Sequence, residues 1–269
     1  MGVLFWPEQA APVAPPLAPV AEAVSPPVAP PAEAVAEASA LVEEETDPQF
    51  GGITGQVVST QPFPDLQFQL DPNCRTNVPD ESLLVDPVTG GIENVFVYLR
   101  TAPTPIHPQM QVGLSQRVVI DNVGASYVPH AFFARVGQAV VFKNGSTFPI
   151  NVHLHPFANP GSNAMLQPMD RIGFMIHFTK PEVLPMKISD DIHAMSSGYG
   201  LVLNHPYAAI TDAAGQFAIP HLPVGTHSFR VWHERVGYIA RDYQVTVTGG
   251  QSVTLPPLTV PSEKLFKKS

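Results

Sequence analysis

The chain of 269 residues carries 31 prolines, 19 glycines and a formal net charge of −9. This length allows one large or two modest domains, and the proline and glycine content is typical of a turn-dense β protein rather than a helical one. With 23 acidic residues against 14 lysines and arginines, the chain lacks the basic character that a nucleic-acid-binding surface requires.

Residues 1–49 are predicted to form a disordered, Pro/Ala-rich N-terminal tail. Alanine, proline, valine and glutamate dominate it, and proline removes backbone donors and stops helices. The segment is therefore expected to be extended, as a spacer or as a remnant of processing. Its start, MGVLFWPEQ, has no basic residue and too short an apolar run for a convincing signal peptide. No apolar run of about 18 residues occurs in the chain, so no transmembrane helix is expected.

Two strands, 53–58 (ITGQVV) and 94–100 (NVFVYLR), are predicted from their β-branched and aromatic residues. Between them, residues 61–91 are dense in Pro, Asp and Asn and are predicted to be a loop. This loop holds Cys74, the one cysteine, which can form no internal disulfide and so does not identify a compartment. We interpret Cys74 as an incidental or small buried residue. A reactive thiol or a metal ligand is the less favoured alternative, because Arg75 is the only basic residue beside it.

Further short strands follow between turn signals such as KNGS, NPGSN and TDAAG, and no segment has a sustained helical period. Many short strands at regular spacing predict an all-β protein made of one or two β-sandwiches. The predicted strands lie at 117–122, 131–137, 138–144, 171–178, 184–190, 207–211, 215–219, 226–234, 243–248 and 252–260.

The segment 211–234, TDAAGQFAIPHLPVGTHSFRVWHE, resembles the carboxypeptidase regulatory-like domain, a small transthyretin-like β-sandwich. Asp212 and Gly215 are expected to make one turn, and the apolar residues of the two flanking strands to alternate inward. Domains of this kind usually open with strands like GGITGQVV and NVFVYLR. The resemblance implies that 50–114 and 206–260 build one sandwich, followed by a C-terminal tail at 261–269.

The intervening residues, 115–205, resemble a cupredoxin of the plastocyanin-like kind. The similarity lies in VPHAFFARVGQAVVFKNGSTFPINVHLH and in LPMKISDDIHAMSSGYGLVLNHPY. It implies a cupredoxin-like Greek-key sandwich, inserted into or packed on the transthyretin-like sandwich. It also implies a periplasmic or secreted protein.

A type 1 copper site uses two histidines, a cysteine thiolate and a weak axial methionine. In the resemblance, Ile150 stands at the first histidine, Asp190 at the cysteine and Ser196 at the methionine, so only His193 remains. A slip of one residue would let Met195 serve as the axial ligand, but no slip restores a thiolate, and Cys74 is distant in sequence. We therefore predict a degenerate copper site in a non-catalytic binding or structural protein, with an unidentified protein or surface as its partner.

A different metal site is the alternative. His153 and His155 lie on one face of an extended strand, and Asp190 and His193 would be near them in a cupredoxin fold. Imidazoles with a carboxylate suit Cu(II) or Zn(II), so these four residues are the candidate ligands for copper or zinc. Other candidates are His130, His177 and His205. The competing interpretation is that each histidine is a hydrogen-bonded turn, surface or core residue.

No enzyme is predicted. His233 and Glu234 could suggest acid–base chemistry, but no nucleophile or third partner accompanies them. Gly237 stands where a zinc-binding H-E-x-x-H motif needs its second histidine. We therefore interpret His233 and Glu234 as a structural pair at a strand end.

Overall fold

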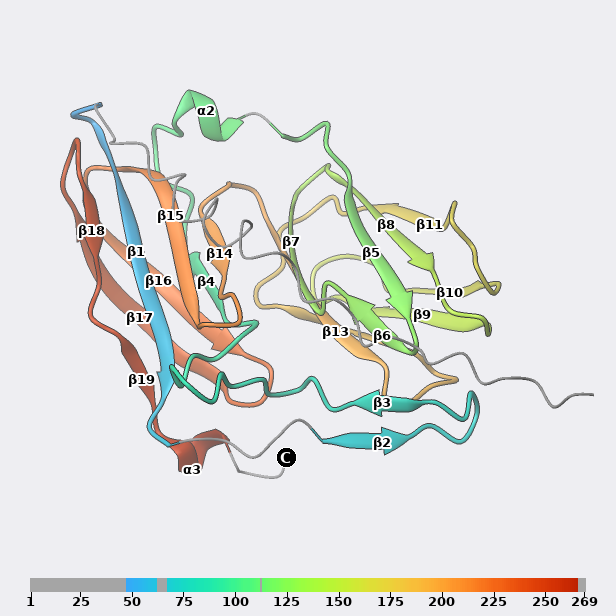
Figure 1. Ribbon diagram of the computed structural model, residues 1–269. Coiled ribbons are helices and arrows are strands. Elements are labelled where there is room, and N and C mark those ends of the chain that lie inside the picture. The colour runs from blue at the N-terminus through green and yellow to red at the C-terminus, as the bar shows by residue number, and fades with distance from the viewer. Residues whose placement is uncertain (1–46, 62–66, 112, 266–269) are drawn as a thin grey trace, which may run out of the picture. The chain divides into compact units, whose positions relative to one another are not determined.

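The computed structural model describes residues 47–61, 67–111 and 113–265 (Figure 1). The predicted tail therefore falls, over residues 1–46, outside the described part of the chain. The described residues belong to one compact unit, Val42–Ser269. Their regular secondary structure is nearly all β-strand, with the short helices α2 (Pro108–Gln111) and α3 (Ser262–Leu265), which confirms the all-β class.

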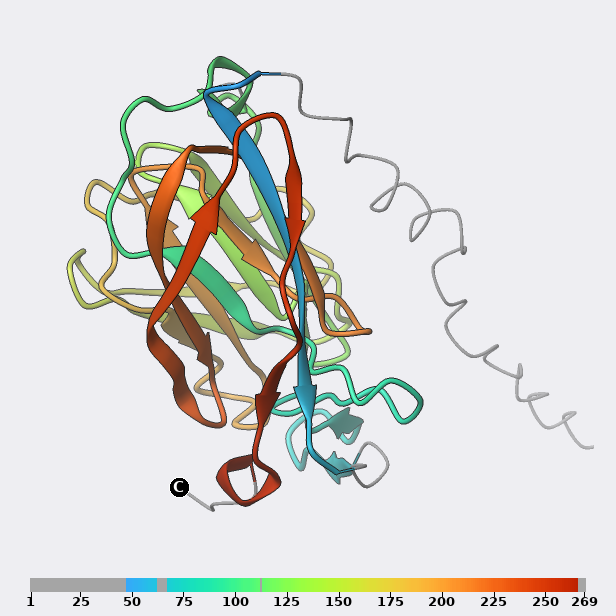
Figure 2. The same cartoon turned by 90° about the vertical axis from the view of Figure 1, so that its left-hand side faces the viewer.

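The first sandwich consists of two facing sheets built from strands near both ends of the chain. One sheet has the order β15–β1–β18, with β19 also paired to β1, and the other has the order β14–β4–β16–β17. Figure 2 shows β1 running alongside β18 and β19, to which it is parallel. The strands are β1 (Phe50–Ser59), β4 (Phe96–Leu99), β14 (Ala208–Ile210), β15 (Gln216–Pro223), β16 (Gly225–His233), β17 (Gly237–Val247), β18 (Ser252–Thr254) and β19 (Leu258–Val260).

Alternate side chains of these strands form the first core, as period-two patterning requires. Phe217 and Ile219 of β15 and Phe229 and Val231 of β16 are all buried, on the faces that the sequence pattern predicts. Helix α3 closes this core with Leu265, which is fully buried. Part of the segment predicted as a C-terminal tail therefore packs against the sandwich.

The second sandwich lies between β4 and β14 in the chain. A five-stranded sheet, β10–β9–β12–β13–β7, faces a four-stranded sheet, β11–β8–β5–β6, in a cupredoxin-like arrangement. The pairs β13–β7 and β5–β8 are parallel and the others antiparallel. The strands are β5 (Val118–Val123), β6 (Ser126–Val128), β7 (Ala131–Arg135), β8 (Ala139–Asn144), β9 (Ile150–His155), β10 (Ser162–Leu166), β11 (Phe174–His177), β12 (Met186–Ser189) and β13 (Ser197–Leu203).

Apolar side chains join the two sandwiches. Phe96, Tyr98 and Trp232 of the first sandwich form one buried cluster with Ala131 and Leu201 of the second. Trp232 also lies 5.2 Å, between ring centroids, from Tyr199 of β13. Trp232 therefore packs in the contact between the two sandwiches.

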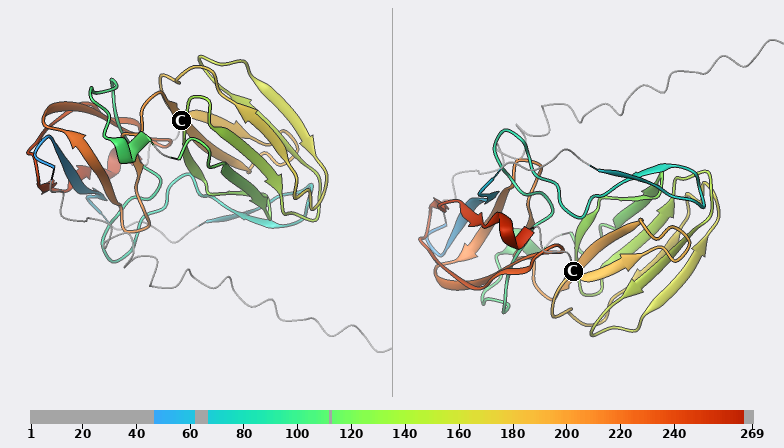
Figure 3. Two further views of the ribbon diagram at one scale, coloured as in Figure 1. Left: turned by 90° about the horizontal axis from the view of Figure 1, so that it is seen from above. Right: turned by 90° about the horizontal axis from the view of Figure 1, so that it is seen from below.

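A hairpin of β2 (Phe68–Leu70) and β3 (Asn77–Pro79) interrupts the segment that we predicted to be a loop. Figures 1 and 3 both show it beside the second sandwich. Its turn is organised by Asp71, whose Oδ1 accepts the backbone N–H groups of Asn73 at 2.8 Å and Cys74 at 3.2 Å. This Asx turn is the conformation that an Asp-Pro-Asn sequence favours. The strands themselves escaped prediction because they are short and β2 is exposed on both faces.

Candidate metal centre

The residues that the resemblance places at the type 1 copper positions are all buried. Ile150 is fully buried in the second core and offers no ligand atom. Ser196 is 1% exposed, and its hydroxyl accepts a hydrogen bond of 2.9 Å from the Asn122 amide. Asp190 is 2% exposed and accepts the backbone N–H groups of Ile192 at 2.8 Å and His193 at 3.1 Å. These residues do not fit type 1 copper, which needs a thiolate in the place of Asp190.

Burial is the main influence on Asp190. It raises the pKa of this carboxyl above its ordinary value, although the N–H groups of His193 and Ile192 oppose the shift. The same two N–H groups shape the loop that follows β12, because they hold residues 190–193 in a tight turn. Asp190 therefore positions His193 in this loop.

His193 is the one predicted ligand that stands at its type 1 position, and it is 2% exposed. Its Nε2 lies 3.1 Å from the carbonyl oxygen of Pro149. A carbonyl oxygen only accepts hydrogen bonds, so Nε2 carries the hydrogen and a neutral ring has its lone pair on Nδ1. Nδ1 lies 3.2 Å from Asp71 Oδ1, which is within ion-pair distance, but it makes no hydrogen bond of acceptable geometry among the described residues.

The turn of the β2–β3 hairpin brings Asp71 and Cys74 to His193. The side-chain amide of Asn73 donates a hydrogen bond to the carbonyl of Ile192, which ties this turn to the loop after β12. The ligand atoms of Asp71, Cys74 and His193 all lie within 4.8 Å of one another, and the described part of the chain contains this group as a candidate for holding a metal ion. The interpretation of Cys74 as a poor candidate because of its distance in sequence was wrong about its position in space.

The carboxyl of Asp71 is 1% exposed and is favoured in its charged form. Burial raises its pKa, but the N–H of Asn73, the ring of His193 and the N–H of Cys74 together outweigh burial and hold the pKa below its ordinary value. Cys74 is half-buried and carries a free thiol. The group thus combines a carboxylate, an imidazole and an accessible thiol.

His153 and His155 lie side by side on β9, with ring centroids 4.0 Å apart, as their spacing predicts. Both ring systems have other partners. His153 Nδ1 is 3.0 Å from both carboxylate oxygens of Asp191, and His155 Nε2 is 2.8 Å from Ser189 Oγ. Burial, His153 and Lys187 lower the pKa of His155.

The four predicted ligands do not form one group of ligand atoms within the described ranges. His193 instead joins Asp71 and Cys74. Metal binding by His153, His155, Asp190 and His193 together stays a prediction.

A second cluster of titratable groups lies where the two sandwiches meet. His130 Nε2 is 2.5 Å from Glu234, and His130 Nδ1 is 3.7 Å from Glu81. Burial lowers the pKa of His130, but the two carboxylates outweigh burial and raise this pKa to about 9. Burial, with repulsion from His130 and Arg235, lowers the pKa of His233 to about 3. Glu234 is thus paired with His130, and the His233–Glu234 pair that we expected at the strand end is replaced by this longer-range ion pair.

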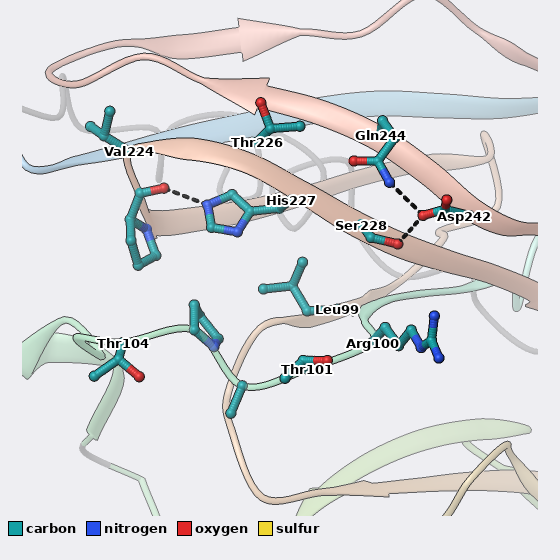
Figure 4. Close-up of a pocket in the computed structure, with 13 residues that line it drawn as sticks. Leu99, Arg100, Thr101, Thr104, Val224, Thr226, His227, Ser228, Asp242 and Gln244 are labelled. Carbon is teal, nitrogen blue, oxygen red and sulfur yellow. Dashed lines mark hydrogen bonds between the residues drawn. The ribbon is translucent and has the colours of Figure 1, made fainter.

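A pocket of about 630 Å³ opens in the first sandwich, between residues 99–104 and strands β16 and β17 (Figure 4). Several of its polar side chains already have hydrogen-bond partners: Asp242 accepts hydrogen bonds from Ser228 and Gln244, and the His227 ring donates to the carbonyl of Pro223. None of the candidate metal ligands lines it. The pocket and the candidate metal centre are therefore separate features.

No known family profile and no curated protein matches the chain. Among solved structures, a purple cupredoxin from Nitrosopumilus maritimus matches with 19% identity and a TM-score of 0.27, over 32% of this chain and 98% of its own. A reduced amicyanin variant matches with 16% identity and a TM-score of 0.28, over 39% of this chain and 97% of its own. Because these TM-scores are low, the fold is assigned from the strand pairing alone. None of the described helices is both long and apolar enough to span a bilayer.

Proposed function

We propose that the chain is a non-catalytic cupredoxin-like protein with a binding or structural role, in which the type 1 copper site has been replaced by contacts that hold the fold. The observation that carries this proposal is that the residues at the expected ligand positions make contacts within the protein. Ile150 packs in the core, Asp190 holds the following loop, and Ser196 bonds to Asn122. Charge-assisted bonds such as those of Asp190 can fix a loop without a metal ion.

The first sandwich supports an accessory role. Asp212 accepts the N–H groups of Ala214 and Gln216 at 2.9 Å and 2.8 Å, and Gly215 has a φ of +74°. This is the turn that the resemblance to carboxypeptidase regulatory-like domains implies.

We propose a protein or a cell surface as the partner. We also propose a periplasmic or secreted location, and fractionation of cells expressing the gene from its native start would test this location.

The alternative function is metal handling through a site that lacks type 1 geometry. One observation favours it: the buried Nδ1 of His193 has no hydrogen bond among the described residues.

A copper titration tests the replaced site. Asp190→Asn keeps an oxygen that can accept the N–H groups of Ile192 and His193 but removes the anionic ligand atom. We expect Cu(II) affinity and the visible spectrum of Asp190→Asn and Ser196→Ala to match those of the wild type within about twofold. A loss of copper affinity of more than about tenfold in either variant, with an unchanged circular dichroism spectrum, would show that these positions still act as ligands and would refute the proposal.

A further inference from the structure

We propose that Asp71, Cys74 and His193 form a three-ligand site for a thiolate-binding transition metal ion, zinc or copper, that is displaced from the type 1 positions. The inference goes beyond the proposed function, because it assigns a site to residues that the proposed function does not use. Two of the three ligands come from the β2–β3 hairpin, outside the strands of the second sandwich.

The His193 ring is buried, its Nε2 donates to the carbonyl of Pro149, and its Nδ1 faces Asp71 Oδ1 at 3.2 Å without a hydrogen bond among the described residues. Buried ring nitrogens normally find a partner, since an unsatisfied one costs stability. His193 thus has a far nitrogen that donates to a backbone carbonyl and a near nitrogen that faces another possible ligand atom, which is the arrangement typical of a metal-ligating histidine.

Asp71 is preorganised in its turn. Its carboxylate is held by the N–H groups of Asn73 and Cys74, so it needs no rearrangement to face His193. The side chain of Asn73 fixes this turn to the carbonyl of Ile192, one residue before His193. A rigid turn that carries two donors is a better scaffold than two independent flexible side chains, because less conformational entropy is lost on binding.

The distances between the three ligand atoms are close to those of a tetrahedral metal site. A tetrahedral ion with bonds of about 2.0–2.3 Å holds its N, O and S ligands roughly 3.3–3.6 Å apart. His193 Nδ1 and Asp71 Oδ1 are 3.2 Å apart, and the Cys74 thiol lies within 4.8 Å of both residues' ligand atoms. A shift of about 1 Å by the half-buried Cys74 side chain would complete the geometry. A fourth position would then be open to water.

The donor set decides the class of ion. A thiolate with an imidazole suits zinc and copper, whereas magnesium and calcium prefer oxygen ligands. The competing interpretation is that Asp71 and His193 are a buried ion pair beside an uninvolved thiol. The two interpretations differ in the role of Cys74, so the experiment centres on this residue.

The test uses the full chain, purified without a histidine tag and kept reduced. Zinc and copper are each added to the metal-free protein, and bound metal is measured by elemental analysis and by competition with a coloured chelator. We expect one ion per chain and a loss of affinity of more than about 100-fold in Cys74→Ser and in His193→Gln. Cobalt(II) added to the wild type should give a thiolate-to-metal absorption band that is absent from Cys74→Ser.

The matched control is the double variant His153→Ala/His155→Ala, which removes the exposed histidine pair and should keep the affinity within about twofold. Cys74→Ser should also keep the melting temperature of the metal-free wild type, because Cys74 is only half-buried. Substoichiometric binding of both metals, or equal affinity in the wild type and Cys74→Ser, would overturn the inference. Binding that is lost only in the double histidine variant would also overturn it. None of these results depends on the Asp190→Asn measurement, so the two proposals can fail separately.

Discussion

Replacing Asp190 by alanine removes a buried carboxylate from the loop that carries His193. Two backbone donors, the N–H groups of Ile192 and His193, lose their acceptor in a site that is 2% exposed. Each buried donor left unsatisfied costs about 1–3 kcal/mol. Removing the carboxylate also relieves the desolvation that raises its pKa, which offsets part of this cost. We therefore expect Asp190→Ala to lower the free energy of unfolding by about 2–4 kcal/mol.

The neighbouring residue supplies the control. Asp191 is half-exposed, and its carboxylate contacts His153 and Asn163 at the surface, so Asp191→Ala should change stability little. Urea unfolding at pH 7, followed by circular dichroism, measures both variants with a metal chelator present and again with added zinc. The reasoning fails if Asp190→Ala lies within about 0.5 kcal/mol of the wild type in chelator, or if Asp191→Ala costs as much. A cost for Asp190→Ala that appears only with zinc would instead identify Asp190 as a metal ligand.

Three further predictions concern pH and packing. The folded-state pKa of His130, about 9, lies above its ordinary 6.5, so its ion pairs should stabilise the protein fully below pH 6.5 and lose this effect as the pH rises through 9. His130→Gln should reduce the change in the free energy of unfolding, measured with urea, between these two pH values. A change as large as that of the wild type would contradict this. Burial lowers the pKa of His205 to about 4, so stability should fall by about 3 kcal/mol between pH 6.5 and 4, and His205→Asn should reduce that slope. Leu265→Ala should cost about 2–5 kcal/mol in the same unfolding assay, whereas a free C-terminal tail would tolerate it at no cost.

The main strands could be predicted because their residues alternate in a way that serves local geometry and core formation at once. In β15 and β16, Phe217, Ile219, Phe229 and Val231 point to one interior, so the period of two was visible in the chain. Strand β10 was missed, because its first two residues, Ser162 and Asn163, belong to the turn signal NPGSN and it contains no β-branched or aromatic residue. The hairpin of β2 and β3 was missed for a similar reason, because proline and aspartate dominate its surroundings.

The candidate metal centre likewise has features that were visible in the local sequence and features that were not. Through the resemblance, the sequence alone predicts that a type 1 site would lack its thiolate at position 190 and keep His193, because residue identity at a fixed spacing is visible in the chain. It also contained the Asx-turn signature of Asp71, a local property of DPNC. The sequence did not show that this turn contacts the loop that carries His193.

By itself, the sequence therefore determined most of the longer strands and the turns between them, and it predicted that ligands of a type 1 copper site are missing. Only the tertiary structure decided that Cys74 and Asp71 lie beside His193, and that Glu234 pairs with His130. The physical reason is that such contacts arise from packing between segments about 100 residues or more apart, such as the bonded Asn73 and Ile192. A periodic pattern shows which face of its own strand is buried. The residues that pack against that face depend on the fold as a whole.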